Sequence, residues 1–223
     1  MLSNSTLNTM VKVKLNLGCG PIGIDSWINY DWGVLAVLSK FVFFRQLLIK
    51  IGVIENFYDM TWPKIHLVDI RKKFPLEDNS IDFIYCSHVL EHFERWQTIE
   101  ILKECRRVLK VDGWMRIVIP DLDEMISEYI KNNKDSKASN VFFREVWGYY
   151  KDQLTGSVFD SLKKKFIRDH KWGYNKRSIT VVLKEAGFQK IKEKKFRQGT
   201  VPDLKDLDIQ LLQKMSLYIE AQK

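Results

Sequence analysis

The chain has 223 residues, of which 45% are hydrophobic and 29% are charged, and its formal net charge is +8. This composition is typical of a globular protein, and no Pro/Gly/Ser-rich linker interrupts it, so we expect one domain over residues 1–223. The positive charge favours acidic partners, although solubility alone explains it equally well. The basic clusters lack the patterns of RNA-recognition strands and zinc fingers, so nucleic acid is not the expected partner.

The cysteines and the N-terminal residues indicate the cellular compartment in which the protein is expected. The three cysteines, Cys19, Cys86 and Cys105, are odd in number and have no CxxC spacing, which argues against a disulfide framework or a zinc knuckle. Residues 1–15 contain no apolar run after a basic start, so they do not resemble a signal peptide. The sequence therefore predicts a cytoplasmic protein.

The predicted elements alternate between strands and helices. Five strands are predicted at Val11–Leu17, Trp27–Asp31, His66–Asp69, Ile81–Cys86 and Trp114–Ile119. Helices are predicted at Glu91–Lys110, Leu122–Lys131 and Ser178–Ala186, and a final pair of strands at Phe188–Phe196 and Ser216–Gln222. Asp121 is expected to cap the second helix, with Glu124 completing a capping box, and Asn132–Asn140 is expected to be a polar loop. The alternation predicts an α/β domain with a mostly parallel sheet.

Val34–Ile54 interrupts this alternation, because it is strongly apolar but contains Lys40, Arg45 and Lys50. Three charges are too many for a membrane span, and they do not share one face of a helix. We expect one or two helices that pack on the sheet or form a lid, with peripheral membrane contact as the weaker alternative. Residues 34–62 and 132–170, the second rich in aromatic residues, are predicted to form a cap or an acceptor pocket.

The stretch from Leu15 to Asp31, LNLGCGPIGIDSWINYD, matches the dinucleotide pattern G-x-G-x-x-G. In dinucleotide-binding folds a full helix follows the loop, and the acid stands about 20 residues further on. Here Asp31 comes eight residues after Gly23, and the few residues between the strands leave no room for a full helix. Without the third glycine, the pattern consists of a strand, a turn at Gly18–Gly20, a second strand and an acid. Such an acid can bind a ribose diol, and Asp69 can bind an adenine amino group at the same edge of the sheet.

Three blocks of this sequence resemble class I S-adenosylmethionine-dependent methyltransferases. They are LNLGCG with Asp31, VDIRKKFPLEDNSIDFIYCSHVLEHF, and RVLKVDGWMRIVIPD, and the resemblance resumes at HKWGYNKRSITVVLKEAGF. The segment HVLEH is most similar to that of small bacterial methyltransferases associated with surface-polysaccharide biosynthesis. The resemblance implies a Rossmann-like, seven-stranded, mostly parallel sheet with an antiparallel last strand and a small helical cap.

The resemblance also implies roles for individual residues. Residues 18–20, with Gly18, Cys19 and Gly20, would contact the methionine part of the cofactor S-adenosyl-L-methionine. Asp31 would bind the ribose, and Asp69, with Ile70 beside it, would bind the adenine. Ser87 and His88 would line the sulfonium pocket. The sequence departs from the family at Asn16, where many members have an acid, and at Asp112–Gly113, which replaces a Gly-Gly pair.

His88, Glu91 and His92 would share one face of a helix. Two interpretations remain open: the histidines act as bases for a hydroxyl acceptor, or Glu91 and His92 cap the helix and support the loop. His170 is a third candidate base. The spacing H-x-x-E-H also matches an inverted zinc-protease motif, which this context disfavours. We expect no metal site, with a weak cation site at the start of the helix as a minor alternative.

The predicted function is a methyltransferase that O-methylates a sugar or glycan precursor. The choice of acceptor rests on the resemblance alone. One alternative is a methyltransferase that acts on RNA or on a lipid-like or quinone-like small molecule. Another is a degenerate S-adenosylmethionine-binding module without turnover. The sequence predicts neither the methylated atom nor the oligomeric state.

Overall fold

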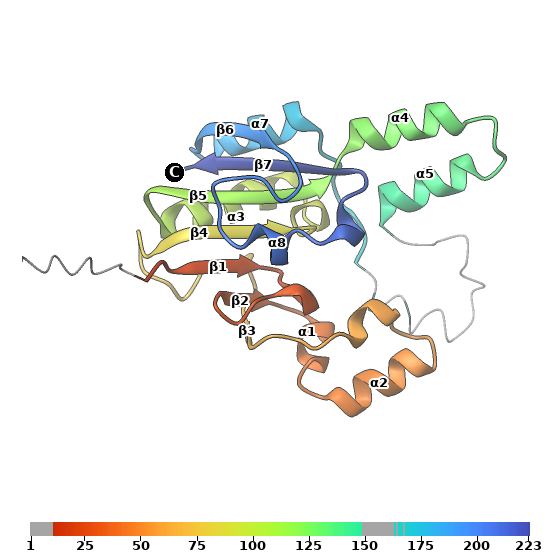
Figure 1. Cartoon of the computed structure of the whole chain (residues 1–223), viewed down its shortest axis with the longest axis horizontal. Helices are drawn as coiled ribbons and strands as arrows, with labels where there is room; N and C mark the ends of the chain where they lie inside the picture. The colour runs from red at the N-terminus through yellow and green to blue at the C-terminus, as the bar shows by residue number, and fades with distance from the viewer. Residues whose placement is uncertain (1–10, 149–162, 164, 167) are drawn as a thin grey trace, which may run out of the picture.

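A seven-stranded sheet forms the centre of the protein (Figure 1). The structure, a computed structural model, describes residues 11–148, 163, 165–166 and 168–223. The strand order is β3-β2-β1-β4-β5-β7-β6. The strands are β1 Lys14–Leu17, β2 Ile28–Asp31, β3 Ile65–Leu67, β4 Ile81–Ser87, β5 Leu109–Pro120, β6 Gln189–Lys194 and β7 Ser216–Gln222.

The directions of the strands confirm the predicted fold class. β1 pairs in parallel with β2 and β4, and the pairs β2–β3 and β4–β5 are also parallel. β7 runs antiparallel to both of its neighbours, β5 and β6, and its arrow points against theirs in Figure 1. The carboxyl ends of β1, β2 and β4 therefore meet at one edge of the sheet, where ligands bind in open α/β sheets.

Two apolar layers hold the sheet. On one face, the core joins the sheet to α3 and α7, whose buried residues include Leu102 and Leu183. On the other face, Trp27 and Tyr85 pack against Leu207 of the short helix α8. The helices are α1 Val34–Leu38, α2 Val42–Lys50, α3 Arg95–Val108, α4 Leu122–Asn132, α5 Ala138–Trp147, α7 Lys176–Glu185 and α8 Leu204–Leu207.

The predicted helix over Glu91–Lys110 begins later than expected. His88 has a positive φ of 53°, and Leu90–His92 form a separate 3-10 turn. The helix α3 starts only at Arg95, because Glu94 and Gln97 form a reciprocal capping box there. The prediction that the H-x-x-E-H motif lies on one helix is therefore wrong, and its side chains are placed by a turn instead.

Other predicted boundaries hold in part. Asp121 caps α4 as predicted, but its side chain accepts from the backbone of Asp123 and forms no capping box with Glu124. The predicted loop over Asn132–Asn140 is too long, since α5 already begins at Ala138. Gly187 follows α7 with a φ of +91°, the left-handed conformation that ends many helices.

The apolar segment after β2 forms α1 and α2. α2 packs on the 3-10 turn Asn56–Asp59, and the side chains of Phe43 and Phe44 are exposed. Arg45 turns inward, and its guanidinium donates to the carbonyls of Ser39 and Met60. Within the described part of the chain, every helix is too short or too polar to span a bilayer. The aromatic stretch of the predicted cap at 149–162 lies outside the described residues.

A buried ion network stabilises the face of the sheet beneath α8. The guanidinium of Arg116 is 0% exposed and lies 2.5 Å from the carboxylate of Asp208 and 3.5 Å from that of Glu220. It also donates to two backbone carbonyls and lies over the ring of Tyr218. Asp208 in turn accepts from the hydroxyl of Tyr85. The network ties β5 and β7 to the chain that crosses this face.

Candidate functional site

The loop after β1 is a tight turn without a full helix. Gly18 and Gly20 have φ values of +63° and +51°, which a residue with a side chain adopts only with strain. The backbone N–H groups of Gly18 and Cys19 both donate to the carbonyl of Tyr30 in the neighbouring strand. Only the 3-10 turn Gly20–Ile22 follows, as predicted from the short spacing.

Asp31 at the end of β2 holds this turn in place. Its Oδ2 accepts from the N–H of Gly20 at 2.8 Å, and its Oδ1 accepts from the N–H of Trp32 at 2.6 Å. Burial raises the pKa of Asp31, and the opposing effects of Gly20, Arg168 and Trp32 do not cancel that rise. A carboxylate has about four acceptor positions, so two remain for a ligand.

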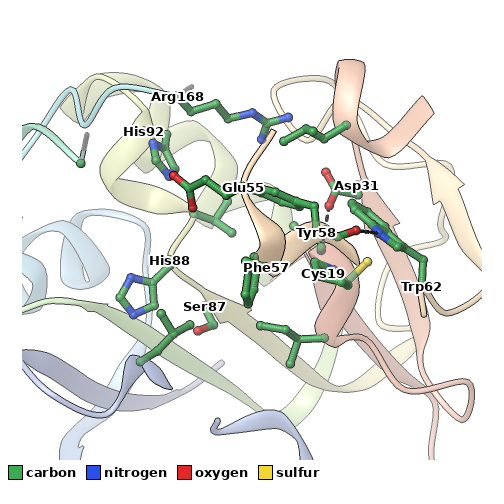
Figure 2. Close-up of a pocket in the computed structure, with 18 of the residues that line it drawn as sticks. Cys19, Asp31, Glu55, Phe57, Tyr58, Trp62, Ser87, His88, His92 and Arg168 are labelled. Atoms are coloured by element: carbon green, nitrogen blue, oxygen red, sulfur yellow. Dashed lines mark hydrogen bonds between the residues drawn. The ribbon is translucent and has the colours of Figure 1, made fainter. Parts of the chain in front are cut away.

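A cavity of about 350 Å³ lies at the carboxyl ends of the strands, at the lower end of the range for small-molecule sites. In Figure 2, Cys19, Asp31 and Tyr58 lie on one side of it, and Ser87 and His88 on the other. The structure thus brings most of the predicted site residues to one cavity: Gly18, Cys19, Gly20, Asp31, Ser87, His88, Glu91 and His92.

Asp69 and Ile70 are not among the residues that line this cavity. The carboxylate of Asp69 forms a two-pronged ion pair with Arg71, at 2.8 Å for each contact, and this contact lowers the pKa of Asp69. The side chain of Ile70 is buried in the apolar core. For Asp69 to bind an adenine amino group, as expected from the sequence, its carboxylate would have to release Arg71.

The cavity also contains aromatic residues that were predicted only as part of a segment. The rings of Tyr58 and Trp62 are stacked, with their centroids 6.3 Å apart. Burial raises the pKa of Tyr58, which keeps its hydroxyl neutral. Arg168, which follows the aromatic stretch, reaches back to donate to the carbonyl of Trp32. No local motif marks Tyr58 or Arg168, because each is brought to the cavity by the path of a long connection.

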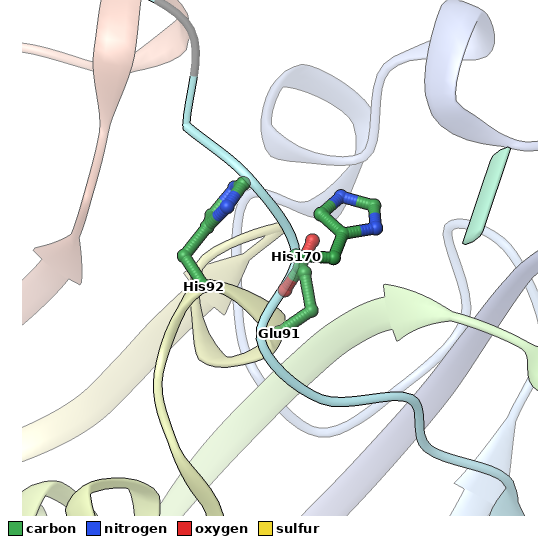
Figure 3. A group of neighbouring side chains, drawn as sticks. All are labelled: Glu91, His92 and His170. Atoms are coloured by element: carbon green, nitrogen blue, oxygen red, sulfur yellow. The ribbon is translucent and has the colours of Figure 1, made fainter. Parts of the chain in front are cut away.

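On the opposite side of the cavity, Glu91 is buried between histidines. Its carboxylate is 2% exposed and lies 3.3 Å from Nδ1 of His88. Burial raises the pKa of Glu91, but the contact with His88 and the nearby His92 and His170 outweigh burial and lower it. Glu91 is therefore an ionised carboxylate in a dry position. Figure 3 shows it directed between the rings of His92 and His170.

Hydrogen bonds distinguish the histidines from one another. Nε2 of His88 lies 3.1 Å from the hydroxyl of Ser216, which itself donates to the carbonyl of Leu212. Both ring nitrogens of His88 therefore face oxygen atoms, which fixes the orientation of the ring. Nδ1 of His92 faces the carbonyl of Asp169 at 3.2 Å, so it must donate. In its neutral form, His92 keeps an electron pair on Nε2.

Comparisons with known proteins agree with this fold. Residues 50–117 match the methyltransferase domain family, a segment that contains Ser87 and the H-x-x-E-H motif but not the Gly18–Asp31 loop. The matched residues make up less than a third of the chain, so the match relates this segment, and not the whole chain, to the methyltransferase domain family.

An uncharacterised protein of Methanocaldococcus jannaschii is 37% identical over 59 residues, which is 26% of this chain and only 25% of that protein. A SAM-dependent methyltransferase from Archaeoglobus fulgidus is 16% identical, with 95% of this chain and 86% of that one covered and a TM-score of 0.49. PigF, solved with SAH, is 14% identical at a TM-score of 0.50, and the likeness covers 95% of this chain and 50% of PigF. At these identities, the likeness to the solved methyltransferases concerns the fold.

Proposed function

We propose that this protein transfers a methyl group from S-adenosylmethionine to a hydroxyl group of a sugar or glycan precursor. One observation carries the proposal: a glycine turn held by Asp31 and a basic cluster around Glu91 face each other across one cavity. The first group suits a nucleoside, and the second suits an acceptor that must lose a proton. A cytoplasmic location, expected from the sequence, belongs to this proposal.

The residues on the glycine side fit the cofactor. A Cβ atom added at Gly20 would meet no atom within 4 Å, so this turn leaves open space at the edge of the cavity. Asp31 has acceptor positions left for the two hydroxyls of a ribose. Gly18, Cys19 and Gly20 would contact the methionine part, and Ser87 and His88 would line the place of the sulfonium. Asp69 and Ile70 would complete the adenine site.

When bound, S-adenosylmethionine supplies a sulfonium methyl group that an oxygen nucleophile can take in a single displacement. The chain must therefore align the acceptor with that methyl group and receive the hydroxyl proton. Of the two ring nitrogens of His92, Nε2 is the one that can accept this proton, because Nδ1 already donates to the carbonyl of Asp169. Glu91 holds His88 by a contact of 3.3 Å, and its carboxylate would stabilise a proton taken up by the neighbouring rings.

Aromatic side chains support a sugar as the acceptor. Phe57, Tyr58 and Trp62 all line the cavity, and flat aromatic faces pack well on the apolar faces of sugar rings. The segment at 34–62 would thus form one wall of the acceptor pocket, as expected from the sequence. The cavity is lined by both polar and apolar groups, which also suits part of a lipid-linked glycan.

Two measurements test the proposed function. Isothermal titration calorimetry with S-adenosylmethionine is expected to show one site per chain. Transfer of radiolabelled methyl should then be followed over nucleotide sugars, lipid-linked glycans, RNA and quinone precursors. Transfer to a sugar hydroxyl supports the proposal, whereas transfer to RNA or a quinone replaces the acceptor. Binding without transfer to any of these acceptors would favour a binding module without turnover, and the absence of binding would overturn the cofactor assignment.

Gly18 and Gly20 should respond differently to replacement by alanine. A Cβ at Gly18 would lie 2.4 Å from a methyl group of Val89, so Gly18→Ala is expected to destabilise the fold by about 2 kcal/mol or more. A Cβ at Gly20 enters open space, so Gly20→Ala should cost about 1 kcal/mol and weaken cofactor binding roughly tenfold. Urea unfolding and calorimetry on both variants separate the two effects. Equal losses of stability in both variants would contradict this prediction.

A further inference from the structure

We propose that Glu91, His92 and His170 bind a divalent transition-metal ion in the wall of the cavity. One potential donor atom of each residue lies within 4.8 Å of those of the other two (Figure 3). All three residues line the cavity, so an ion has a path of entry from solvent. Two histidines and one carboxylate also form the ligand set of many catalytic zinc and iron sites.

The state of Glu91 is the first independent observation. Both carboxylate oxygens are buried, and neither has a hydrogen-bond partner. A buried carboxylate without hydrogen bonds is costly, and the 3.3 Å contact with His88 compensates only one of its two oxygens. A cation between Glu91 and the histidine rings would satisfy the free oxygen.

The orientation of the two histidines is the second observation. Nδ1 of His92 donates to the carbonyl of Asp169, and Nδ1 of His170 donates to that of Val146 at 3.1 Å. Such backbone contacts fix the ring and leave Nε2 as the electron-pair donor, which is the usual arrangement of histidine ligands.

The backbone brings the distant His170 to this place. The N–H groups of Lys171 and Trp172 both donate to the carbonyl of Glu91, which fixes the two segments side by side. A Cβ added at Gly148 would lie 2.6 Å from Nε2 of His170, so the ring can occupy this place only beside a residue without a side chain. The cluster is therefore built by two segments 78 residues apart, rather than by the H-x-x-E-H motif alone.

The donor set indicates the kind of ion. Imidazole nitrogens suit Zn²⁺, Co²⁺, Fe²⁺ or Mn²⁺, whereas Mg²⁺ and Ca²⁺ prefer oxygen ligands. Bonds of roughly 2.0–2.1 Å place tetrahedral ligands about 3.4 Å apart, so the three side chains would close by about 1.5 Å on binding.

The ion would also deepen the proposed function, and this part of the inference rests on that function. A hydroxyl oxygen bound to a divalent ion loses its proton more readily than a free one. His92 would then act as a ligand of the ion rather than as the base, and the hydroxyl proton would pass to water in the cavity, which is open to solvent. The ion would fix the acceptor oxygen at the side of the cavity that lies opposite the glycine turn.

The test uses the full chain without a histidine tag, dialysed against a chelator and titrated with Co²⁺ or Zn²⁺. The wild type is expected to bind one ion per chain, seen by metal analysis, and to show the visible absorption of nitrogen-ligated Co²⁺. His92→Ala, His170→Ala and the near-isosteric Glu91→Gln should each weaken binding at least tenfold. His66→Ala, at an exposed histidine outside the cluster, should leave it unchanged. Circular dichroism confirms that each variant is folded.

Metal binding is measured without cofactor or acceptor, so its outcome is separate from that of the proposed function. Failure of the wild type to bind one ion per chain would overturn the inference, as would undiminished binding by a folded Glu91→Gln. If metal is bound but no methyl transfer is found, the site stands and the proposed function fails. If transfer is found, removal of the ion should lower kcat more than it weakens cofactor binding. A kcat that chelation leaves unchanged would remove the ion from the reaction.

Discussion

Replacement of Asp31 by alanine is expected to weaken S-adenosylmethionine binding by roughly 30- to 1000-fold. Under the proposed function, the variant would lose two charge-assisted hydrogen bonds to the ribose, for which about 2–4 kcal/mol is the expected total. It also frees the N–H of Gly20, which Asp31 holds at 2.8 Å, and so loosens the turn at the mouth of the cavity. Calorimetry with purified variant and wild type measures the loss directly.

The matched control is Asp25→Ala, which removes an exposed carboxylate from the same loop. Asp25 accepts a hydrogen bond from the backbone N–H of Lys64 and does not line the cavity. The affinity of the Asp25→Ala variant for the cofactor should therefore stay near that of the wild type. If the two variants bind equally well, Asp31 does not contact the ribose. Asp69→Ala tests the adenine assignment in the same assay, with an expected loss of about tenfold.

The pH dependence of binding provides a second check on Asp31. Because burial raises its pKa, Asp31 takes up a proton at a higher pH than an ordinary aspartate does. If the ionised form binds the ribose, as proposed, the affinity for S-adenosylmethionine should be complete well above that pKa and should fall as the pH is lowered through it. The fall should begin at a higher pH than the ordinary carboxyl value predicts, and it should be absent from Asp31→Ala.

Local spacing is sufficient to predict the glycine turn. The short run from Gly20 to Ile28 cannot hold a full helix, and the structure has only a 3-10 turn there. Gly23, the third glycine of the pattern, serves packing instead. A Cβ at Gly23 would lie 2.5 Å from the side chain of Asn29 and 2.6 Å from Pro63. These close neighbours explain why the position needs a small residue. Its φ of −63° is not in the left-handed region, so backbone conformation does not require the glycine.

Contacts across long sequence separations could not be predicted in this way. His170 appears in the sequence as a lone histidine after a basic stretch, yet it lies against His92 with ring centroids 5.1 Å apart. The helical spacing of the H-x-x-E-H motif suggested a shared helix face, whereas the positive φ of His88 and the cap at Glu94 divide the motif from α3. The sequence indicated the acid–base chemistry of these residues, but it did not predict the turn that orients their side chains.

The apolar periodicity likewise indicates which elements form the core, but not which charges enter it. Arg116 occupies an inward position of a strand with apolar neighbours, and its partner Asp208 follows 92 residues later. Neither residue is part of a recognisable motif. The fold alone brings these two charges together, and for this reason the network around Arg116 becomes apparent only in the structure.

Arg116→Ala is expected to lower the free energy of unfolding by about 3–5 kcal/mol. The guanidinium is 0% exposed, and its loss removes the ion-pair partner of the buried Asp208 carboxylate and leaves Glu220 only the more distant Lys194, at 3.7 Å. The cost of an uncompensated buried charge, rather than the strength of the ion pair itself, accounts for most of this loss. Equilibrium unfolding in urea, followed by circular dichroism, measures the change.

Arg71→Ala provides the comparison, since it also breaks an arginine–aspartate pair, the one with Asp69. The side chain of Arg71 is 50% exposed, so solvent screens this pair and the expected loss is below about 1 kcal/mol. A loss in Arg116→Ala no larger than in Arg71→Ala would mean that water reaches the buried carboxylates. In the double variant Arg116→Met with Asp208→Asn, the loss should be smaller than in Arg116→Ala, because one of the stranded charges is removed with its partner. That recovery would attribute the instability to the stranded charges and not to the lost volume of the arginine.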